Sequence, residues 1–429
     1  MTPKLYPTIG LEIHVELKTL SKMFCTCPAV HFQVKPNTHT CPVCLGLPGA
    51  LPVPNQKAID WAIMVGLALD CQINLETTFD RKHYFYPDLP KGYQISQLDD
   101  PFCFSGKLEL DSGKIVRINR VHLEEDTAKL IHKKVNNQPV TLIDFNRSGV
   151  PLVEIVTEPD LHHAADAKEF LKKLQAIVRS LNVSNCDMEK GSMRLEANIS
   201  LSPDPNQLAD YKVEVKNLNS FRFVEQAINY EISRQSEFLK SKKKPVQETR
   251  GYNPKLKQTF TQRIKETAED YRYFPEPDIP PIILTPEYIK ALRSKLPQLP
   301  ASRIKALIDQ YHLSANTAKI IVADPKKLQY FKANLKNLEP IKLANLIVNK
   351  KIDISKPLNT QLRAGLTAKI DLNLLDQVIT ENSEVVAKYK AGKTSVLGFL
   401  VGQVMKLTHG QADPKQTQKI LLDKLNLKS

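Results

Sequence analysis

The chain has 429 residues, with 60 Lys and Arg against 46 Asp and Glu, a formal net charge of +14 and seven cysteines. This length predicts two or three domains whose cores need no disulfides, and the basic excess favours a polyanionic partner. The N-terminus lacks an apolar signal core and no run of eighteen apolar residues occurs, so we expect a soluble, cytoplasmic protein without a membrane partner. Internal repeats of fixed period are absent, which excludes solenoid architectures.

The first predicted element is a β-strand over residues 9–17. Apolar residues alternate with polar ones along it, and one face carries Glu12, His14 and Glu16. Next-but-one residues on a strand lie roughly 6.6 Å apart, so Glu12 and His14 could both reach one ion above the sheet. A half-exposed strand whose polar face simply meets water would give the same pattern.

Four cysteines follow in two close pairs, Cys25-Thr26-Cys27 and Cys41-Pro42-Val43-Cys44. Two thiolate pairs separated by a loop are typical of a structural Zn²⁺ site, so residues 25–44 are predicted to form a zinc-binding insertion. The first pair is unusually tight, and His31 or His39 could replace one sulfur. Reduced cysteines packed as small apolar groups, or a redox pair, are the alternative. Since four sulfurs leave no open coordination position, the chemistry is expected elsewhere.

Two aromatic and proline-rich segments, residues 84–97 and 270–278, are predicted to be stiff loops. Such loops suit a wall that stacks a base or holds a chain end, because aromatic faces accept any base and proline limits the disorder that binding removes. They could equally close the core beneath long connections.

Further strands are predicted over residues 121–126, 152–156, 193–199 and 211–217, each with polar side chains alternating with apolar ones or set among them. Several strands with acidic, basic and amide groups on one face predict a sheet whose polar face forms a binding surface, which we call the cradle. Crowded carboxylates repel one another unless divalent cations neutralise them, and oxygen ligands with one imidazole suit Mg²⁺ or Mn²⁺.

The cradle pattern predicts one metal site made of His14, Glu125 and Glu154, with Glu12 and Glu124 near it. Glu154 has apolar neighbours on both sides, so it is hard to explain as a merely solvated side chain.

The rest of the chain is predicted to be helical. Ser220 or Asn219 should cap a helix over residues 221–239, and a proline series ending at Pro286 marks a change of composition near residue 285. Beyond it we predict helices over 287–296, 301–310, 314–322, 325–334, 374–389, 395–407 and 414–425.

The sequence resembles the B subunits of aspartyl/glutamyl-tRNA amidotransferases and their mitochondrial and archaeal relatives. The resemblance rests on residues 9–17, 80–88, 93–97, 123–126, 144–152, 216–221, 247–250 and 271–278, with 398–406 similar to the family's tail. It covers nearly all of residues 1–285. The resemblance implies that the chain is shorter than typical members between about residues 340 and 375 and that a helical segment is missing there.

This resemblance implies a ligase subunit that uses ATP and Mg²⁺ in translation. The family phosphorylates the side-chain carboxylate of mischarged Glu-tRNA(Gln) or Asp-tRNA(Asn), and glutamine-derived ammonia then displaces the phosphate. Ammonia comes from an amidase-type glutaminase subunit, which a small strap subunit joins to the family's ATP-using chain in a heterotrimer. The resemblance also implies that His14, Glu125 and Glu154 bind the metal. Glu12, Glu124, Lys216 and Arg147 are expected to act in catalysis, and Lys216 and Arg147 are expected to contact phosphate or carboxylate groups.

Residues 391–395 read Ala-Gly-Lys-Thr-Ser and resemble the end of a phosphate-binding loop. A true one needs a glycine five residues before its Gly-Lys and a preceding strand; Ala387 stands there and no strand is predicted, so no phosphate cradle is expected. Lys388, Lys390 and Lys393 are instead predicted to contact a tRNA backbone, although any of them could be an ordinary solvated lysine.

The expected fold is α+β: a β-rich N-terminal cradle with a largely antiparallel sheet and flanking helices, followed by an all-α domain and tail. We expect a catalytic cradle domain over residues 1–292, a helical domain over 293–365 and a tRNA-binding helical tail over 366–429. A zinc-containing tRNA-binding protein without catalysis and a free-standing ATP-dependent ligase for a small acidic substrate are the alternatives.

Overall fold

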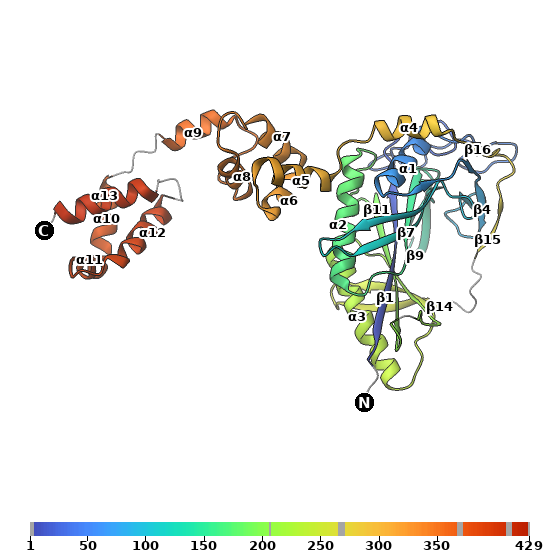
Figure 1. Ribbon diagram of the computed structural model, residues 1–429. Helices are drawn as coiled ribbons and strands as arrows, with labels where there is room; N and C mark the ends of the chain where they lie inside the picture. Colours follow the sequence, from blue (N-terminus) through green and yellow to red (C-terminus); the bar gives the residue numbers. More distant parts are fainter. Residues whose placement is uncertain (1–3, 206, 265–270, 367–371, 409–413, 428–429) are drawn as a thin grey trace. The chain divides into compact units, whose positions relative to one another are not determined.

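The computed structural model describes residues 4–205, 207–264, 271–366, 372–408 and 414–427 (Figure 1). The chain divides into two compact units, residues 1–300 and 301–429. The first unit is built on a mixed but largely antiparallel sheet with helices on one side, and the second is helical. The α+β fold is therefore confirmed.

The main sheet of the first unit has nine strands in the order β14-β13-β12-β11-β1-β10-β7-β6-β2. Their bounds are β1 Tyr6–Glu16, β2 Gln72–Ile73, β6 Cys103–Glu109, β7 Ile115–Glu125, β10 Pro151–Thr157, β11 Met193–Ser202, β12 Val213–Lys216, β13 Glu248–Asn253 and β14 Gln258–Ile264. Neighbours pair antiparallel except β12 and β13, which are parallel. The first strand of the chain thus lies in the middle of the sheet.

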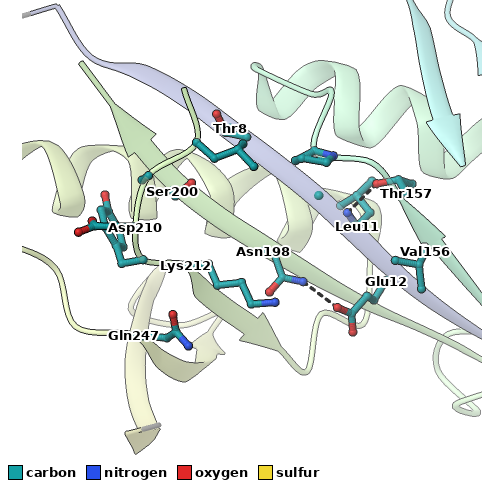
Figure 2. Close-up of a pocket in the computed structure, with 15 residues that line it drawn as sticks. Thr8, Leu11, Glu12, Val156, Thr157, Asn198, Ser200, Asp210, Lys212 and Gln247 are labelled. Atoms are coloured by element: carbon teal, nitrogen blue, oxygen red, sulfur yellow. Dashed lines mark hydrogen bonds between the residues drawn. The ribbon is translucent and has the colours of Figure 1, made fainter. Parts of the chain in front are cut away.

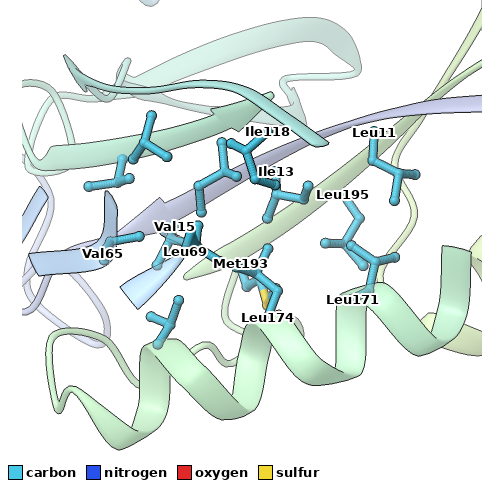
Figure 3. Packing of buried hydrophobic residues seen from close by; sticks show 14 of the residues in the cluster. Leu11, Ile13, Val15, Val65, Leu69, Ile118, Leu171, Leu174, Met193 and Leu195 are labelled. Carbon is cyan, nitrogen blue, oxygen red and sulfur yellow. The ribbon is translucent and has the colours of Figure 1, made fainter. Parts of the chain in front are cut away.

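One face of this sheet is apolar and is covered by helices. Ile13 and Val15 of β1 and Leu195 of β11 point into the same buried cluster as Leu171 and Leu174 of helix α2 (Figure 3). The three helices that supply most of the cover are α1 Gln56–Ala68, α2 Ala164–Ser180 and α3 Phe221–Lys240. The apolar residues of the alternating pattern that predicted the strands are the ones that form this core. The polar residues between them lie on the opposite face of the sheet.

Helix α3 shows how local chemistry sets the element bounds. Ser220 has an extended backbone and its hydroxyl accepts a hydrogen bond from the Phe223 amide, which satisfies a donor that the helix itself leaves free. The predicted cap and start are confirmed. Because this helix connects β12 to the parallel strand β13, it supplies the long crossover that parallel pairing requires.

Three smaller sheets complete the described strands of the first unit. Strands β15 Arg272–Pro275, β4 Asp80–His83 and β5 Tyr93–Ser96 form one, β3 Glu76–Thr77 pairs with β16 Ile282–Ile283, and β8 Lys129–Val135 pairs with β9 Gln138–Asp144. The segments 84–97 and 270–278 were predicted as loops throughout, which is wrong at residues 93–96 and 272–275, because both pair with β4. Residue 270 lies outside the described residues.

The second unit contains two separate apolar clusters. The first is formed by α5 Pro300–Tyr311, α6 Ala315–Val322, α7 Pro325–Ala333, α8 Pro340–Val348 and α9 Leu358–Leu366. The second is formed by α10 Leu372–Glu381, α11 Ser383–Lys390, α12 Leu397–Leu407 and α13 Pro414–Leu427, and the 3₁₀ turn η1 Thr394–Val396 lies between α11 and α12. Helix α4 Pro286–Ser294 packs on the first unit through Leu292, although it lies beyond the composition change near residue 285.

One sequence expectation for this helical part needs correction. The helix predicted over 374–389 is two helices, because Asn382 has a non-helical backbone (φ −117°, ψ 41°) between α10 and α11. Residues 340–366 hold α8 and α9, and the expectation that this region is shorter than in typical family members stays a prediction. Among the described residues, no helix has both the length and the apolar character that a membrane span requires.

Candidate active site

The open face of the main sheet brings a histidine and two glutamates together. Register places His14 of β1 opposite Glu154 of β10, and Glu154 opposite His122 of β7, so their side chains leave the same face. His14 Nε2 lies 3.3 Å from Glu124 Oε1 and 3.5 Å from Glu154 Oε2. His122 Nε2 lies 3.2 Å from the same Glu154 oxygen.

This cluster, which we call the His14 cluster (His14, Glu124 and Glu154), offers one nitrogen and two carboxylate oxygens within 4.8 Å of one another. Both glutamates are buried. Hard oxygen donors with one imidazole suit a divalent cation such as Mg²⁺ or Mn²⁺, so the donor set fits the metal that the family resemblance implies.

The electrostatics of the cluster favour its charged forms. Burial lowers the pKa of His14, but the facing carboxylates of Glu154 and Glu124 outweigh it and raise that pKa well above its ordinary value. Burial raises the pKa of Glu154, yet His122 and His14 bring it well below its usual range. A proton on His14 thus compensates the carboxylates, and a bound cation would take that proton's place.

Glu125 was predicted to be a member of this site, and the structure does not place it there. Side chains alternate between the two faces along β7. Glu124 therefore projects from the polar face together with His122, whereas Glu125 projects from the same face as the buried Leu123. The Glu125 carboxylate accepts a hydrogen bond from the Ile95 amide at 3.0 Å and pairs with Lys91. Glu124, which was expected only nearby, takes the position beside His14.

A second acidic group adjoins the first along the same face. Glu12, Glu196 and Glu214 each present an oxygen within 4.8 Å of the others. Lys216 Nζ lies 2.9 Å from Glu196 and 3.3 Å from Glu214, and Asn198 donates to Glu12 at 2.9 Å. Burial and the neighbouring carboxylates, Glu154 first among them, raise the pKa of Glu12. The structure therefore brings Glu12 and Lys216 to the open face, as expected.

Arg147 contacts backbone carbonyl oxygens and one carboxylate beside the loop that follows β7. Its guanidinium donates to the carbonyl oxygens of Thr127 and Ala128, both at 2.9 Å, and lies 3.5 Å from Asp126. Asp126 also pairs with Arg194. These contacts hold the chain where it leaves β7 for the β8–β9 hairpin, so Arg147 braces this loop.

Sequence reasoning missed two residues beside the His14 cluster. Lys82 of β4 faces it: burial lowers the pKa of Lys82, but Glu124 and the other nearby acidic groups outweigh this and raise the pKa. Its ammonium also lies 4.8 Å from the centre of the Tyr271 ring. His122 could have been predicted, because it lies two residues before Glu124 and therefore on the same face of the strand. Lys82 could not have been predicted, because nothing in the sequence indicates that β4 covers the cradle.

The four cysteines of residues 25–44 converge on one point, with sulfurs within 4.8 Å of one another. Lys22 is fully buried beside them and donates to the carbonyl oxygen of His39 at 2.7 Å and to Cys44 Sγ at 3.5 Å. A buried ammonium suits a cluster of thiolate sulfurs, so the donor set fits Zn²⁺. The ring of His31 lies instead 3.1 Å from Glu16, and that of His39 lies 2.7 Å from the Val30 carbonyl oxygen.

The three lysines predicted to contact tRNA lie together in the second unit. Lys388 and Lys390 end helix α11, and Lys393 follows in the turn before η1. A helix rather than a strand precedes Gly392, which agrees with the absence of a phosphate-binding loop at residues 391–395.

The first unit is thus a largely antiparallel sheet with one face packed by helices and the other lined by two acidic clusters and half-buried lysines, which is a suitable surface for catalysis. Residues 7–290 match the model described as the GatB/GatE catalytic domain, and residues 363–425 match the one described as the GatB domain. The chain therefore belongs to the GatB/GatE family, and the resemblance drawn from its motifs is confirmed.

Relatives extend the likeness over nearly the whole chain. The B subunit of the aspartyl/glutamyl-tRNA(Asn/Gln) amidotransferase of Persephonella marina is 40% identical over 474 aligned residues, covering 98% of this chain and 99% of that protein. The corresponding B subunits of Thermosipho melanesiensis and Roseiflexus castenholzii are 42% and 41% identical, covering 96% and 97% of this chain and 98% of each relative.

Proposed function

We propose that this chain is the carboxylate-activating subunit of an ATP-dependent tRNA amidotransferase. It phosphorylates the side-chain carboxylate of mischarged Glu-tRNA(Gln), Asp-tRNA(Asn) or both, and the acyl phosphate is amidated with glutamine-derived ammonia during protein synthesis. The observation that carries the proposal is the convergence of His14, Glu124 and Glu154 on the open face of a family-matched sheet.

Acyl activation needs positive charge because both reactants, a carboxylate and a phosphate, are anionic. Lys82 and Lys216 are held beside the two acidic clusters and supply fixed cations in a partly dehydrated site. A Mg²⁺ ion, when bound by His14, Glu124 and Glu154 with Glu12 beside them, would stabilise the charge of the transferring phosphoryl group. The chain's own residues thus position the two anions and exclude water, while ammonia must come from elsewhere.

The proposal includes partners. An amidase-type glutaminase subunit would deliver ammonia, and a small strap subunit would hold it to this chain in a cytoplasmic heterotrimer. A division into a cradle over residues 1–292, a helical domain over 293–365 and a tail over 366–429 would let the helical parts bind the tRNA body by its shape and backbone. Lys388, Lys390 and Lys393 are the proposed phosphate contacts.

The test is reconstitution of the complex with ATP, glutamine and Glu-tRNA(Gln), followed by detection of Gln-tRNA(Gln). We expect product with the wild-type chain and a loss of at least about 100-fold with Glu154→Gln, in line with removal of a charge-stabilising group. Glu109→Gln, an exposed glutamate on β6, is the matched control and should keep full activity. Unchanged activity in Glu154→Gln would favour the non-catalytic tRNA-binding protein, and ATP turnover that ignores omission of tRNA would favour a free-standing ligase.

A structural Zn²⁺ ion at Cys25, Cys27, Cys41 and Cys44 is a separate part of the proposal. Replacing Cys25 and Cys41 with Ser should remove about one equivalent of zinc, measured by metal analysis of the purified protein. Cys186→Ser, at a buried cysteine outside the cluster, should keep the metal. Equal zinc content in both variants would reject the assignment.

A further inference from the structure

A network of charged side chains is buried between helix α3 and the edge of the main sheet. Glu231 of α3 is fully buried, and Glu248 and Arg250 of β13 are 5% and 7% exposed. Arg250 Nε lies 3.1 Å from Glu231 Oε1, and Arg250 Nη1 lies 2.7 Å from Glu248 Oε1. Arg234 Nη2 of α3 lies 2.8 Å from Glu231 Oε2. We call Glu231, Arg234, Glu248 and Arg250 the Arg250 network.

Stability alone does not explain why four charges lie in this layer. The two acids and two bases balance, yet removing each charge from water is unfavourable. Buried ion networks can often be replaced by apolar residues of similar volume without loss of stability. The best-attested role of such a network is to specify one arrangement of the chain over another. The question is therefore which arrangement the Arg250 network specifies.

The arrangement in question is the register of β13. Glu248 and Arg250 point toward α3, so Thr249 between them projects from the opposite, polar face. Their partners on β12, Val213 and Val215, belong to the buried apolar cluster, which agrees with this assignment of faces. A shift of one residue would turn Arg250 to the cradle and Thr249 to the helix. Because pairing with β14 is irregular between Thr249 and Arg250, the strand ladder alone fixes this register weakly.

Thr249 is the residue through which this register reaches the cradle. Its hydroxyl donates a hydrogen bond to Glu214 Oε2 at 2.8 Å, and both side chains are buried. The other oxygen of the same carboxylate, Oε1, lies 3.3 Å from Lys216 Nζ. The hydroxyl of Thr249 thus fixes the rotation of the carboxylate that faces the ammonium.

The start of β13 also borders the rest of the second acidic group. Gln247, directly before β13, lines a cavity of about 350 Å³ over Gly10 together with Glu12 (Figure 2). The hydrogen bond that Asn198 donates to Glu12 lies at the same cavity. The register of β13 therefore affects the lining of this cavity as well as the surroundings of Lys216.

We propose that Thr249 is a positioning residue for Lys216, and that the Arg250 network holds β13 in the register that presents Thr249 to the cradle. Lys216 supplies a fixed cation where two anions must approach, so its direction matters most while charge is transferred. Without the Thr249 hydroxyl, a buried oxygen of Glu214 lacks its donor and the carboxylate no longer keeps its rotation. The inference rests on the proposed function and specifies what aims one of its cations.

The first experiment measures formation of Gln-tRNA(Gln) by the assembled complex. Thr249→Val keeps the volume and branching of the side chain and removes only the hydroxyl. It should lower kcat by about 10-fold and change KM for ATP and for mischarged tRNA by less than about twofold, because the lost interaction acts in the transition state. Thr249→Ser restores the hydroxyl and should keep kcat within about twofold of wild type.

Thr141→Val is the matched control, because it removes an exposed hydroxyl that lies 2.9 Å from the His132 ring in the β8–β9 hairpin. It should behave as the wild type does. Equal kcat in Thr249→Val and the wild type would overturn the proposal. Equal losses in Thr249→Val and Thr249→Ser would also overturn it, because the hydroxyl would then not be the group that matters.

The second experiment tests the network. Glu231→Leu combined with Arg250→Met removes one acid and one base, and leaves Arg234 Nη2 3.4 Å from Glu248 Oε1. The unfolding temperature should stay close to that of the wild type. Amide hydrogen exchange in β13 should become at least about 10-fold faster, and kcat should fall as it does in Thr249→Val. Wild-type exchange and kcat in the double variant would overturn the role of the network.

The two experiments fail in different ways from the proposed function. The Thr249 variants change no charge, so they decide the positioning role even where the double variant unfolds. A wild-type complex that forms no Gln-tRNA(Gln) would reject the proposed function. Exchange in β13 is measured without any substrate, so faster exchange in the double variant would still support the register that the network specifies.

Discussion

Glu124 and Glu125 are neighbours in the chain but have different partners, because side chains alternate along a strand. Glu124 faces His14 at 3.3 Å, whereas Glu125 pairs with Lys91 on the other side. Sequence reasoning chose Glu125, although the apolar parity of Val121 and Leu123 already indicated that residues 122 and 124 share the polar face. The period of two was applied to β1 and not carried through to this segment.

The contrast between the two glutamates gives a prediction. Glu124→Gln should weaken Mn²⁺ binding to the cradle by at least about 10-fold, since it removes one charged ligand, and should change stability little. Glu125→Gln should keep Mn²⁺ affinity but destabilise the first unit by roughly 3 kcal/mol, because it leaves the largely buried Lys91 ammonium without a charge partner. Electron paramagnetic resonance titration with Mn²⁺ and denaturant unfolding measure the two effects; the reverse pattern would restore Glu125 as the ligand.

Cys71 provides a pH-dependent prediction. Burial, with a smaller effect of the neighbouring Asp70 charge, raises the pKa of the Cys71 thiol to about 12. The folded chain thus holds this proton more tightly than the unfolded chain, where a thiol ionises near about pH 8.5. The resulting stabilisation is complete below about pH 8.5 and is lost as the pH rises toward about 12. Iodoacetamide at about pH 8 should therefore alkylate Cys71 slowly in folded protein and rapidly in urea, as mass spectrometry would show; fast labelling of folded protein would contradict this.

At the scale of elements, helix α1 is held against β6 by a close approach at Gly66. A Cβ atom at this position would lie 2.3 Å from Cys103 Sγ and 2.7 Å from Cys103 Cβ. Glycine in a helix is normally less favourable than alanine by roughly 0.5–1 kcal/mol, yet here the missing methyl group lets the helix approach the strand. Packing outweighs propensity at this residue.

Gly66→Ala should consequently destabilise the first unit by about 1–3 kcal/mol, the usual effect of overpacking a core. Gly402→Ala in helix α12 is the control, since nothing lies within 4 Å of a Cβ there, and should be neutral or stabilise its helix. Amide hydrogen exchange in α1 and α12 would measure each effect locally. A stabilised Gly66→Ala variant would show that α1 moves away from β6 without penalty.

Most strands of the cradle could be predicted because burial on one face imposes the alternation seen in β1, β7, β11 and β12. Pairing could not be predicted: β15 and β5 were read as loop because their partner β4 contains no apolar residue that would mark it as a strand, and it lies far from β15 in the sequence. The membership of His14 and Glu154 in the site could be predicted from the sequence, since each is a polar residue within an otherwise apolar pattern of a strand. Lys82 and the cavity over Gly10 arise from packing between distant segments, which no local pattern encodes.

At the scale of the whole molecule, the described apolar residues form three separate clusters. One belongs to the first unit, and the helices after Pro300 contain the other two, formed around Phe331 and around Leu400. Each of the smaller clusters has few buried residues, so little apolar area stabilises it. Cooperative unfolding of the entire chain is therefore not expected.

Calorimetry should show at least two unfolding transitions for the full chain. Phe331→Ala, at a fully buried ring, should destabilise the helices around it by about 3–5 kcal/mol and leave the main transition of the first unit unchanged. Phe170→Ala, at an equally buried ring of helix α2, should lower the main transition instead. A single transition shifted equally by both changes would contradict independent clusters.

The central place of β1 in the sheet also affects synthesis on the ribosome. Both of its neighbours come from distant sequence, β10 beginning at Pro151 and β11 ending at Ser202. At about 5–20 residues per second, the emerging strand waits roughly 10–40 s before its second neighbour has been translated. For that time its unpaired backbone and apolar face are exposed to other nascent chains, so the N-terminal segment that anchors the finished sheet is also the one most in need of protection by chaperones.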